Sequence, residues 1–366
     1  MKRLSIVLAA LVACSAACSR QPANQAPAAT ATPTPAPAPA VPSAPIGSAG
    51  TLYVTNEVGD DLSVVDVANQ KVIATIPLGK RPRGIRPSPD GTLLYVALSG
   101  SPIAGPGVDE SKLPPPDKRA DGIGIVDVKA QRLLKVLPGG SDPEQAAVSA
   151  DGKKLFIANE DTGQVTVLNA ETGDVVSTIK VGGEPEGVNL EPDGKAVWVT
   201  SEEDSAVYVI DTAKPRLRRK IDVGPRPRST AFLPDGSRAY VPSENGGDVR
   251  VIDTKTYKEI ATIKLNGELQ RPMGGVTSPD GKTLYMTTGR GKTVAIIDTA
   301  TNQHVGSVEV GERPWGIAMS PDGKMLFTAN GTSNDVSFVD TASRKVVAKV
   351  KVGNRPWGVA FLPPAN

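Results

Sequence analysis

A motif of the form hydrophobic-Gly-x-x-Pro-x-Gly-hydrophobic recurs seven times along the chain at a nearly constant interval. Its prolines are separated by 61, 42, 42, 45, 42 and 42 residues, and an Asp-Gly pair follows the first six copies in step with them. Two landmarks that keep the same period indicate one structural unit used seven times. The seven prolines are Pro82, Pro143, Pro185, Pro227, Pro272, Pro314 and Pro356.

A single unit shows which secondary structure the repeat encodes. Short apolar and β-branched runs cover residues 186–190, 196–200, 206–210 and 219–223, and Asp-Gly or Asp-Thr turns separate them. Such runs are typical of strands, and Asp-Gly supplies the positive φ of a tight hairpin. One four-stranded sheet cannot bury both of its faces, whereas sheets arranged radially can. The sequence therefore predicts an all-β, seven-bladed β-propeller with four antiparallel strands per blade.

The two ends of the repeat region predict how the ring closes. The first unit begins at its second strand with residues 51–56, and residues 357–361 follow the last full unit as an unpaired innermost strand. Pairing these segments completes blade 1 from both chain ends and removes an open sheet edge. We therefore expect the propeller to span residues 51–362, with the C-terminal strand closing blade 1.

One interval departs from the period by about nineteen residues, because residues 99–122 are inserted between the second and third strands of blade 2. Two interpretations are open. The segment is a tolerated surface insertion, which costs little in closure entropy, or it is a proline-stiffened flap over one face that captures a partner or ligand.

The first fifty residues predict export. A basic start and a short apolar run in residues 1–18 form the pattern of a signal peptide, and Leu11–Cys14 resembles the bacterial lipobox. We expect lipidation at Cys14, with Cys18 as the alternative, and the serine after each cysteine resembles the signal for the outer membrane. Residues 19–50 are rich in Pro and Ala and predict a disordered spacer. The expected location is thus a periplasm-facing or surface lipoprotein.

Composition excludes several classes of function. The chain has 41 basic and 39 acidic residues, and three of the basic ones precede residue 51, which leaves 38 basic and 39 acidic residues in the repeats. This balance argues against nucleic-acid binding, which needs a basic face. The single histidine, His304, is expected in a surface turn, and both cysteines precede residue 19. Haem ligation, a His-ligated metal and Cys–His catalysis are therefore not expected, and no cofactor is predicted.

Tyr53-Val54-Thr55-Asn56 resembles the tetrapeptide that names the YVTN family of bacterial and archaeal β-propellers. Weaker copies begin at Phe156, Tyr240 and Phe327, and the companion Val-Ile-Asp-Thr begins at Val209 and Val251. Runs such as residues 313–316 (Arg-Pro-Trp-Gly) resemble a subgroup of exported propellers associated with pyrroloquinoline-quinone-dependent alcohol catabolism. That resemblance implies an accessory role without a defined reaction.

In a propeller, the loop before the innermost strand and the loop between the second and third strands emerge on one face. The proline motif should therefore surround the mouth of the central channel, with acidic, basic and aromatic positions in different blades. These residues form a binding mouth, or they are solvated charges that pair with one another while the tryptophans cover the closing seam. The candidate mouth residues are Arg81, Arg83, Glu144, Glu160, Glu186, Glu202, Arg228, Glu244, Trp315 and Trp357.

The same carboxylates allow a metal site. Glu144 and Glu186, with Glu160 and Glu202, offer the oxygen ligands that Ca²⁺ prefers. The repeated aspartates at the third-strand ends, such as Asp66 and Asp127, are better explained as turn formers that accept backbone N–H groups.

Two functions remain in competition. The first is a monomeric, membrane-tethered and non-enzymatic module that binds an envelope protein or small ligand at the mouth, as an accessory to a quinone-dependent dehydrogenase system. The alternative is a lactonase-type hydrolase in which channel carboxylates act as general base or bind a divalent metal. A redox enzyme would need ligands that the chain lacks.

Overall fold

The computed structural model describes residues 49–103, 109 and 112–364, which belong to one compact unit, Ser43–Asn366. The predicted signal segment, both cysteines and the predicted spacer up to residue 48 lie outside the described residues, so these predictions remain untested. Within the described ranges, no helix has the length and apolar character needed to cross a membrane.

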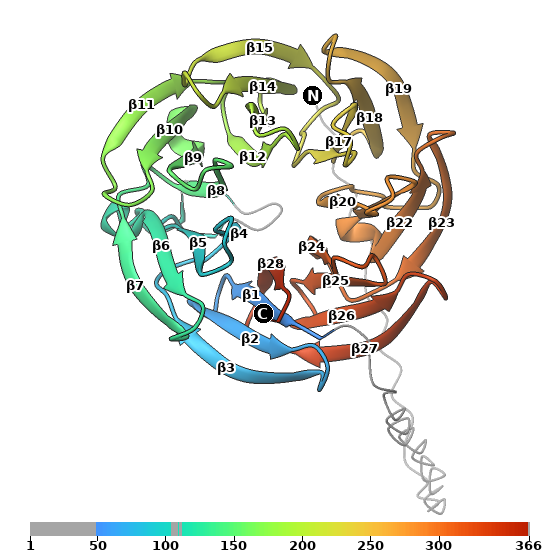
Figure 1. Cartoon of the computed structure of the whole chain (residues 1–366), viewed down its shortest axis with the longest axis horizontal. Helices are drawn as coiled ribbons and strands as arrows, with labels where there is room; N and C mark the ends of the chain where they lie inside the picture. Colours follow the sequence, from blue (N-terminus) through green and yellow to red (C-terminus); the bar gives the residue numbers. More distant parts are fainter. Residues whose placement is uncertain (1–48, 104–108, 110–111, 365–366) are drawn as a thin grey trace, which may run out of the picture. The chain divides into compact units, whose positions relative to one another are not determined.

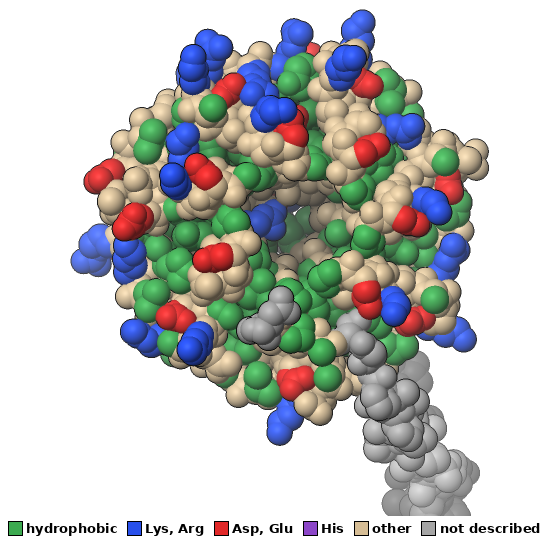
Figure 2. Space-filling model, viewed as in Figure 1, with side chains coloured by type: hydrophobic (Ala, Val, Ile, Leu, Met, Phe, Trp, Pro, Cys, Tyr) green, Lys and Arg blue, Asp and Glu red, His purple; other side chains and the backbone are tan. Residues whose placement is uncertain are grey.

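The described strands form seven four-stranded antiparallel sheets around a central opening (Figures 1 and 2). We number the sheets as blades in chain order, so that blade 1 contains β1. In each blade one strand lies beside the axis and another lies on the outer rim (Figure 1). This arrangement confirms the predicted seven-bladed β-propeller with four strands per blade.

The strands of each blade are given from the axis outward. Blade 1 consists of β28 (Pro356–Leu362), β1 (Thr51–Asn56), β2 (Asp61–Asp66) and β3 (Lys71–Pro77). Blade 2 consists of β4 (Ile85–Pro87), β5 (Leu93–Leu98), β6 (Gly122–Asp127) and β7 (Arg132–Leu137). Blade 3 consists of β8 (Pro143–Val148), β9 (Lys154–Asn159), β10 (Gln164–Asn169) and β11 (Val175–Lys180). Blade 4 consists of β12 (Pro185–Leu190), β13 (Ala196–Ser201), β14 (Ala206–Asp211) and β15 (Leu217–Asp222).

The remaining blades follow the same order. Blade 5 consists of β16 (Ala231–Phe232), β17 (Arg238–Ser243), β18 (Asp248–Asp253) and β19 (Lys258–Lys264). Blade 6 consists of β20 (Gly275–Thr277), β21 (Thr283–Thr287), β22 (Thr293–Asp298) and β23 (Gln303–Glu309). Blade 7 consists of β24 (Pro314–Met319), β25 (Met325–Asn330), β26 (Asp335–Asp340) and β27 (Lys345–Lys351). Short 3₁₀ turns are η2 (Lys118–Ala120), η3 (Glu160–Thr162) and η4 (Gly289–Gly291).

Blade 1 closes the ring by pairing the two ends of the repeat region. β28 is antiparallel to β1, with Tyr53 opposite Ala360. The backbone N–H of Gly358 donates to Thr55 Oγ1 at 2.9 Å, and Thr55 in turn donates to the carbonyl oxygen of Arg83 in blade 2 at 2.7 Å. The predicted closure by the C-terminal strand is confirmed, and a buried hydroxyl links the closing blade to its neighbour.

The hydrophobic core lies between neighbouring blades. Phe156 of blade 3 belongs to the same buried cluster as Val188 and Val199 of blade 4, and similar clusters join other blade pairs. Middle strands such as β26 are buried almost throughout, whereas an outer strand such as β27 alternates exposed residues with partly or fully buried ones. Burial on both faces explains why the inner runs lack a clean alternation.

Turn residues behave as predicted, with one correction. Asp66 Oδ1 accepts the N–H of Asn69 at 3.0 Å and Asp127 Oδ1 accepts that of Ala130 at 2.8 Å, which confirms the turn-forming role. The prediction that His304 lies in a turn is wrong, because β23 already begins at Gln303. There His304 Nδ1 accepts the backbone N–H of Asn266 at 2.9 Å, so an inter-blade contact holds it within the outer strand.

Candidate functional site

The mouth of the channel is a wide cavity of about 840 Å³. Seven of the ten predicted mouth residues line it, and Glu186 lines a narrower cavity beneath. Glu202 and Glu244 line neither cavity but contact Arg228, which does. The structure therefore brings all ten residues into one connected region. The seven that line the mouth are Arg81, Arg83, Glu144, Glu160, Arg228, Trp315 and Trp357.

The backbone directs charged side chains to this cavity in a recurrent way. In six of the seven repeats the residue before the motif proline is left-handed, with φ between +44° and +57°, and all six residues line the mouth. Such φ values are uncommon for residues other than glycine, and strained positions tend to gather at functional sites. The six are Arg81, Asp142, Glu184, Arg226, Arg313 and Arg355.

Arg83 is the centre of the first charge cluster. It is almost fully buried and donates to Asp142 and Glu144 of blade 3, and it lies 3.4 Å from Glu160. Its Nη2 also donates to the carbonyl oxygen of Pro143 at 2.8 Å. One guanidinium group therefore serves three carboxylates that come from the next blade.

Arg228 is the centre of a second, similar cluster. Its Nη1 donates to Glu186 and Glu202 of blade 4, and its Nε donates to Glu244 at 2.6 Å. Arg226 adds a second cation, since its Nε lies 3.3 Å from Glu244. The guanidinium of Arg228 also lies 5.3 Å from the Trp315 ring. Arg228 therefore reaches two carboxylates of the preceding blade, whereas Arg83 reaches those of the following blade.

The aromatic part of the mouth lies on blades 7 and 1. Trp315 and Trp357 stack with their ring centroids 5.4 Å apart, and Arg313 lies over the Trp315 ring at 5.3 Å. Arg355 instead pairs with Glu57 at 2.8 Å. Among the described residues Arg313 has no carboxylate partner, which distinguishes it from Arg83 and Arg228.

Acidic and basic residues of the mouth pair with one another, as one interpretation held. The central pairs of Arg83 with Glu144 and of Arg228 with Glu186 are buried between blades, whereas the outlying Arg226 is more exposed. This pairing between blades has a physical cause: an arginine side chain is long enough to reach the adjacent blade, and its fork of donors suits several carboxylates at once.

Burial shifts the proton affinity of the two central glutamates. Burial raises the pKa of Glu144 well above its ordinary value. Arg83 opposes this rise, whereas the negative charges of Glu160 and Glu186 add to it. Burial likewise raises the pKa of Glu186, with Arg228 opposing and Glu202 adding to it. Carboxyl groups with raised pKa values are suited to proton transfer near neutral pH.

The insertion of blade 2 contributes to the same cavity. Residues 101–103 and 113–116 line the mouth, and Arg81 Nη1 donates to the carbonyl oxygen of Ser101 at 2.8 Å. Lys118 at the end of the insertion pairs with Asp161 of blade 3. The described parts of the segment therefore border the mouth cavity, and their capture of a partner or ligand stays a prediction.

The predicted Ca²⁺ set does not form a common ligand cluster. In the part of the chain that the structure describes, no group of three or more His, Cys, Asp or Glu residues is arranged to hold a metal ion. Glu144 and Glu186 have guanidinium groups as their nearest charged partners instead. These residues do not fit a resident divalent cation.

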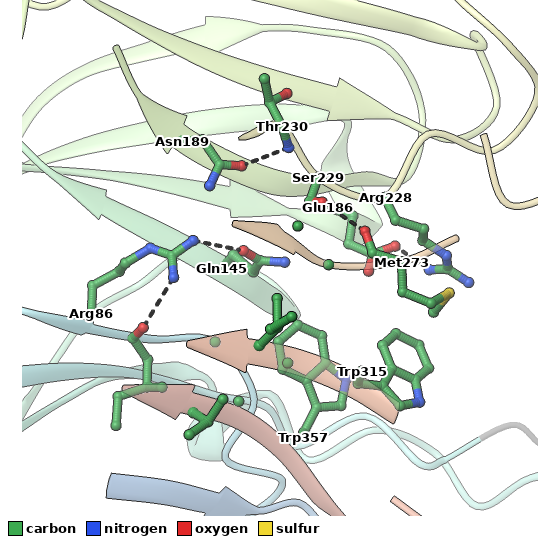
Figure 3. A pocket seen from close by; sticks show the side chains of 18 residues that line it. Arg86, Gln145, Glu186, Asn189, Arg228, Ser229, Thr230, Met273, Trp315 and Trp357 are labelled. Atoms are coloured by element: carbon green, nitrogen blue, oxygen red, sulfur yellow. Dashed lines mark hydrogen bonds and ion pairs between the residues drawn. The ribbon is translucent and has the colours of Figure 1, made fainter. Parts of the chain in front are cut away.

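Below the mouth, the channel narrows to a cavity of about 90 Å³ (Figure 3). Arg86, Asn189 and Thr230 line it, and sequence reasoning missed all three. Gln145 and Ser229 also line it, although they stand where five other repeats have glycine. A signal was available, because the positions equivalent to Arg86 in the other repeats are mostly Ala or Val.

Comparison with known proteins places this geometry in a family. The family model described as a seven-bladed β-propeller lactonase matches residues 127–350. The seven-bladed β-propeller protein Rv1057 of Mycobacterium tuberculosis is 30% identical over 116 residues, which are 31% of this chain and 25% of that protein. That alignment thus spans only a quarter of the relative.

Solved structures share the fold at low sequence identity. A candidate 6-phosphogluconolactonase from Bacteroides fragilis superposes with a TM-score of 0.69 at 20% identity, covering 86% of this chain and 98% of that one. A second one from Bacteroides uniformis gives 0.69 at 19%, covering 86% and 100%. Hydrazine synthase of Kuenenia stuttgartiensis gives 0.65 at 21%, covering 78% and 96%.

The family model extends from the end of β6 to β27, which is more than half of the chain. It includes the whole cluster around Arg228 and the carboxylates of the first cluster, whereas Arg83 lies before the matched residues. With its sevenfold repeat and ring closure, the chain belongs to the seven-bladed β-propeller lactonase family.

Proposed function

We propose that this protein hydrolyses an anionic lactone in the mouth cavity, with Glu144 activating the attacking water. The observation that carries the proposal is the state of the Glu144 carboxyl group. Arg83 holds Oε1, whereas Oε2 is buried without a hydrogen-bond partner in the described structure. A fixed carboxyl group with a raised pKa and one unused oxygen is suited to act as a general base.

Glu186 supplies the second proton transfer in this proposal. Its carboxyl group lies against that of Glu202, and burial raises the pKa of both groups. Two carboxyl groups in contact share a proton, because both cannot ionise cheaply at short range. Water attacks the lactone carbonyl as Glu144 takes its proton, the ring C–O bond breaks, and Glu186 gives a proton to the leaving oxygen.

The cations and aromatic rings indicate the substrate class. Arg313, which lacks a carboxylate partner among the described residues, is available to bind an anionic group at the mouth. The stacked pair of Trp315 and Trp357 offers an apolar surface for the carbon skeleton of a ring. Relatives described as candidate 6-phosphogluconolactonases make a phosphorylated sugar lactone the first substrate to test.

The test uses the purified full chain with 6-phosphogluconolactone and with gluconolactone, and measures acid release above the uncatalysed rate. We expect turnover of the phosphorylated lactone, and a loss of roughly 10²–10⁴-fold in kcat for Glu144→Gln and for Glu186→Gln. Chelation should leave the rate unchanged. Rates equal to the uncatalysed reaction with both lactones would reject the proposal.

A second candidate function follows from the insertion over the mouth. Residues 113–116 could hold a protein partner against the cavity that they line, in an exported protein tethered through Cys14 or Cys18. In this proposal the protein is a non-enzymatic accessory, for example to a quinone-dependent dehydrogenase. If this second function is correct, an envelope protein should bind the wild type and Glu144→Gln equally, and Leu113→Glu should abolish the binding.

A further inference from the structure

The narrow cavity beneath the mouth has a polar half and an apolar half. Blades 2 to 5 contribute the polar side chains, and blades 6, 7 and 1 contribute Met273, Ile317 and Val359 (Figure 3). On the face drawn in Figure 2, hydrophobic side chains surround the central opening and a basic side chain is visible inside it. The polar side chains are those of Arg86, Gln145, Asn189, Ser229 and Thr230, together with Glu186 and Arg228, which pair with each other.

Arg86 is a cation without a counter-charge. Nη1 donates to the carbonyl oxygen of Ile85 at 3.3 Å and Nη2 donates to Gln145 Oε1 at 3.4 Å, and no carboxylate of the described chain pairs with it. Burial lowers the pKa of Arg86, although a guanidinium stays charged at physiological pH. Arg86 is partly buried, and a cation that is partly withdrawn from water without a counter-charge favours an anion from outside the chain.

Thr230 provides a second, independent observation. Only 3% of its surface is exposed, and Oγ1 is buried without a hydrogen-bond partner among the described residues. Its backbone N–H donates to Asn189 Oδ1 at 3.0 Å, which holds the two residues together (Figure 3). Buried hydroxyl groups normally find a partner, so the unused hydroxyl of a residue that lines the cavity indicates a missing acceptor.

We propose that the narrow cavity binds a small oxyanion, a carboxylate or phosphate group, with Arg86 as the cationic anchor and the Thr230 hydroxyl as a further donor. The volume of about 90 Å³ equals the share of roughly three water molecules in the liquid, which suits one such group and excludes a sugar phosphate. The rest of a larger ligand would lie in the mouth, since both cavities share Arg228, Trp315 and Trp357. The site does not depend on hydrolysis at the mouth.

Calorimetric titration of the full chain with inorganic phosphate at constant ionic strength tests the site. We expect saturable binding of one phosphate per chain, at least tenfold weaker binding for Arg86→Gln, weaker binding for Thr230→Val, and unchanged binding for the outer-strand control Arg219→Gln. Phosphate should raise the melting temperature of the wild type but not that of Arg86→Gln, which also reports whether the variant is folded. No saturable binding, or equal binding by a folded Arg86→Gln, would overturn the proposal.

A second titration, with 6-phosphogluconate and gluconate, separates the two sources of the anion. If the anionic group of a larger ligand occupies the site, Arg86→Gln should weaken the binding of 6-phosphogluconate as much as that of phosphate. If free phosphate is the ligand, the substitution should affect phosphate alone. Either result supports the anion site. Neither measurement depends on lactone turnover, so a failure of the anion site can be distinguished from a failure of the proposed hydrolase activity.

Discussion

Arg83 of blade 2 and Glu144 of blade 3 form a buried ion pair that links two neighbouring blades at the channel mouth. A similar pair joins Arg228 of blade 5 to Glu186 of blade 4, with the order of the two blades reversed. In both cases the arginine and the glutamate belong to neighbouring blades whose sheets are separate. These pairs therefore contribute to the packing of blades as well as to the electrostatics of the mouth.

Replacing Arg83 by Met should destabilise the propeller by about 3–5 kcal/mol, because Asp142 and Glu144 would remain buried without their cation and the more exposed Glu160 would lose a partner. Urea unfolding of the full chain measures the change. The matched control is Arg219→Met on the exposed strand β15, which should stay within about 0.5 kcal/mol of the wild type. Equal effects of the two substitutions would contradict the buried network.

The raised pKa of Glu144 predicts a pH-dependent difference in stability between the wild type and Glu144→Gln. The folded state binds the proton more tightly than the unfolded state, so the wild type loses stability as pH rises above the ordinary value of 4.5. The Gln variant lacks this loss. Its free energy of unfolding relative to the wild type should therefore increase with pH, by at most about 1.4 kcal/mol per pH unit.

The control for that experiment has the opposite sign. Hydrogen bonds from Asn69 lower the pKa of Asp66 below its ordinary value of 3.8, so the wild type gains stability as pH rises towards that value, and Asp66→Asn should lose stability relative to it over that range. Unfolding curves that extend from below pH 3.8 up to about pH 8 check both slopes, because the Asp66 slope lies below 3.8 and the Glu144 slope lies above 4.5. A flat or falling difference for Glu144→Gln would show that its pKa is not raised.

Trp198 and Trp315 lie in different environments, so replacing each of them by Ala should have a different effect. Trp198 is fully buried, meets Phe232 edge-on at 5.4 Å and donates Nε1 to Glu191 at 2.6 Å, so Trp198→Ala should cost about 3–5 kcal/mol. Trp315 lines the mouth, and Trp315→Ala should cost less than half as much. If the proposed lactonase activity is present, Trp315→Ala should instead raise the KM for the lactone. Thermal unfolding and steady-state kinetics separate these effects.

The repeat made the fold and the ring closure predictable. The spacing of the prolines placed the blades, and the unpaired segments around Tyr53 and Trp357 identified the closing strands, because each repeat encodes its own hairpins locally. The same register placed the charged motif positions at the channel mouth. The blade and strand to which a residue belongs could therefore be inferred from the sequence, because the backbone alone determines them.

Side-chain partners could not be inferred in the same way. Sequence reasoning assigned Arg83 and Glu144 to separate basic and acidic sectors, whereas the arginine reaches across the blade boundary to the glutamate. It also stopped at the motif and missed Arg86, which lies two residues beyond Gly84 and lines the narrow cavity. The length and rotamer of the arginine side chains decide both features, and the strand register does not determine either of them.

The closing contact predicts the behaviour of two glycines. A Cβ at Gly358 would lie 2.7 Å from the carbonyl oxygen of Arg83 and 3.0 Å from Thr55 Oγ1, so Gly358→Ala must push blade 1 away from blade 2. We expect a loss of about 1–3 kcal/mol. A Cβ at Gly306 on the outer strand β23 would meet nothing closer than 3.6 Å, so Gly306→Ala should be neutral or stabilising by up to about 1 kcal/mol. Chemical denaturation compares the two variants, and equal stabilities would mean that blades 1 and 2 are not in close contact at the closure.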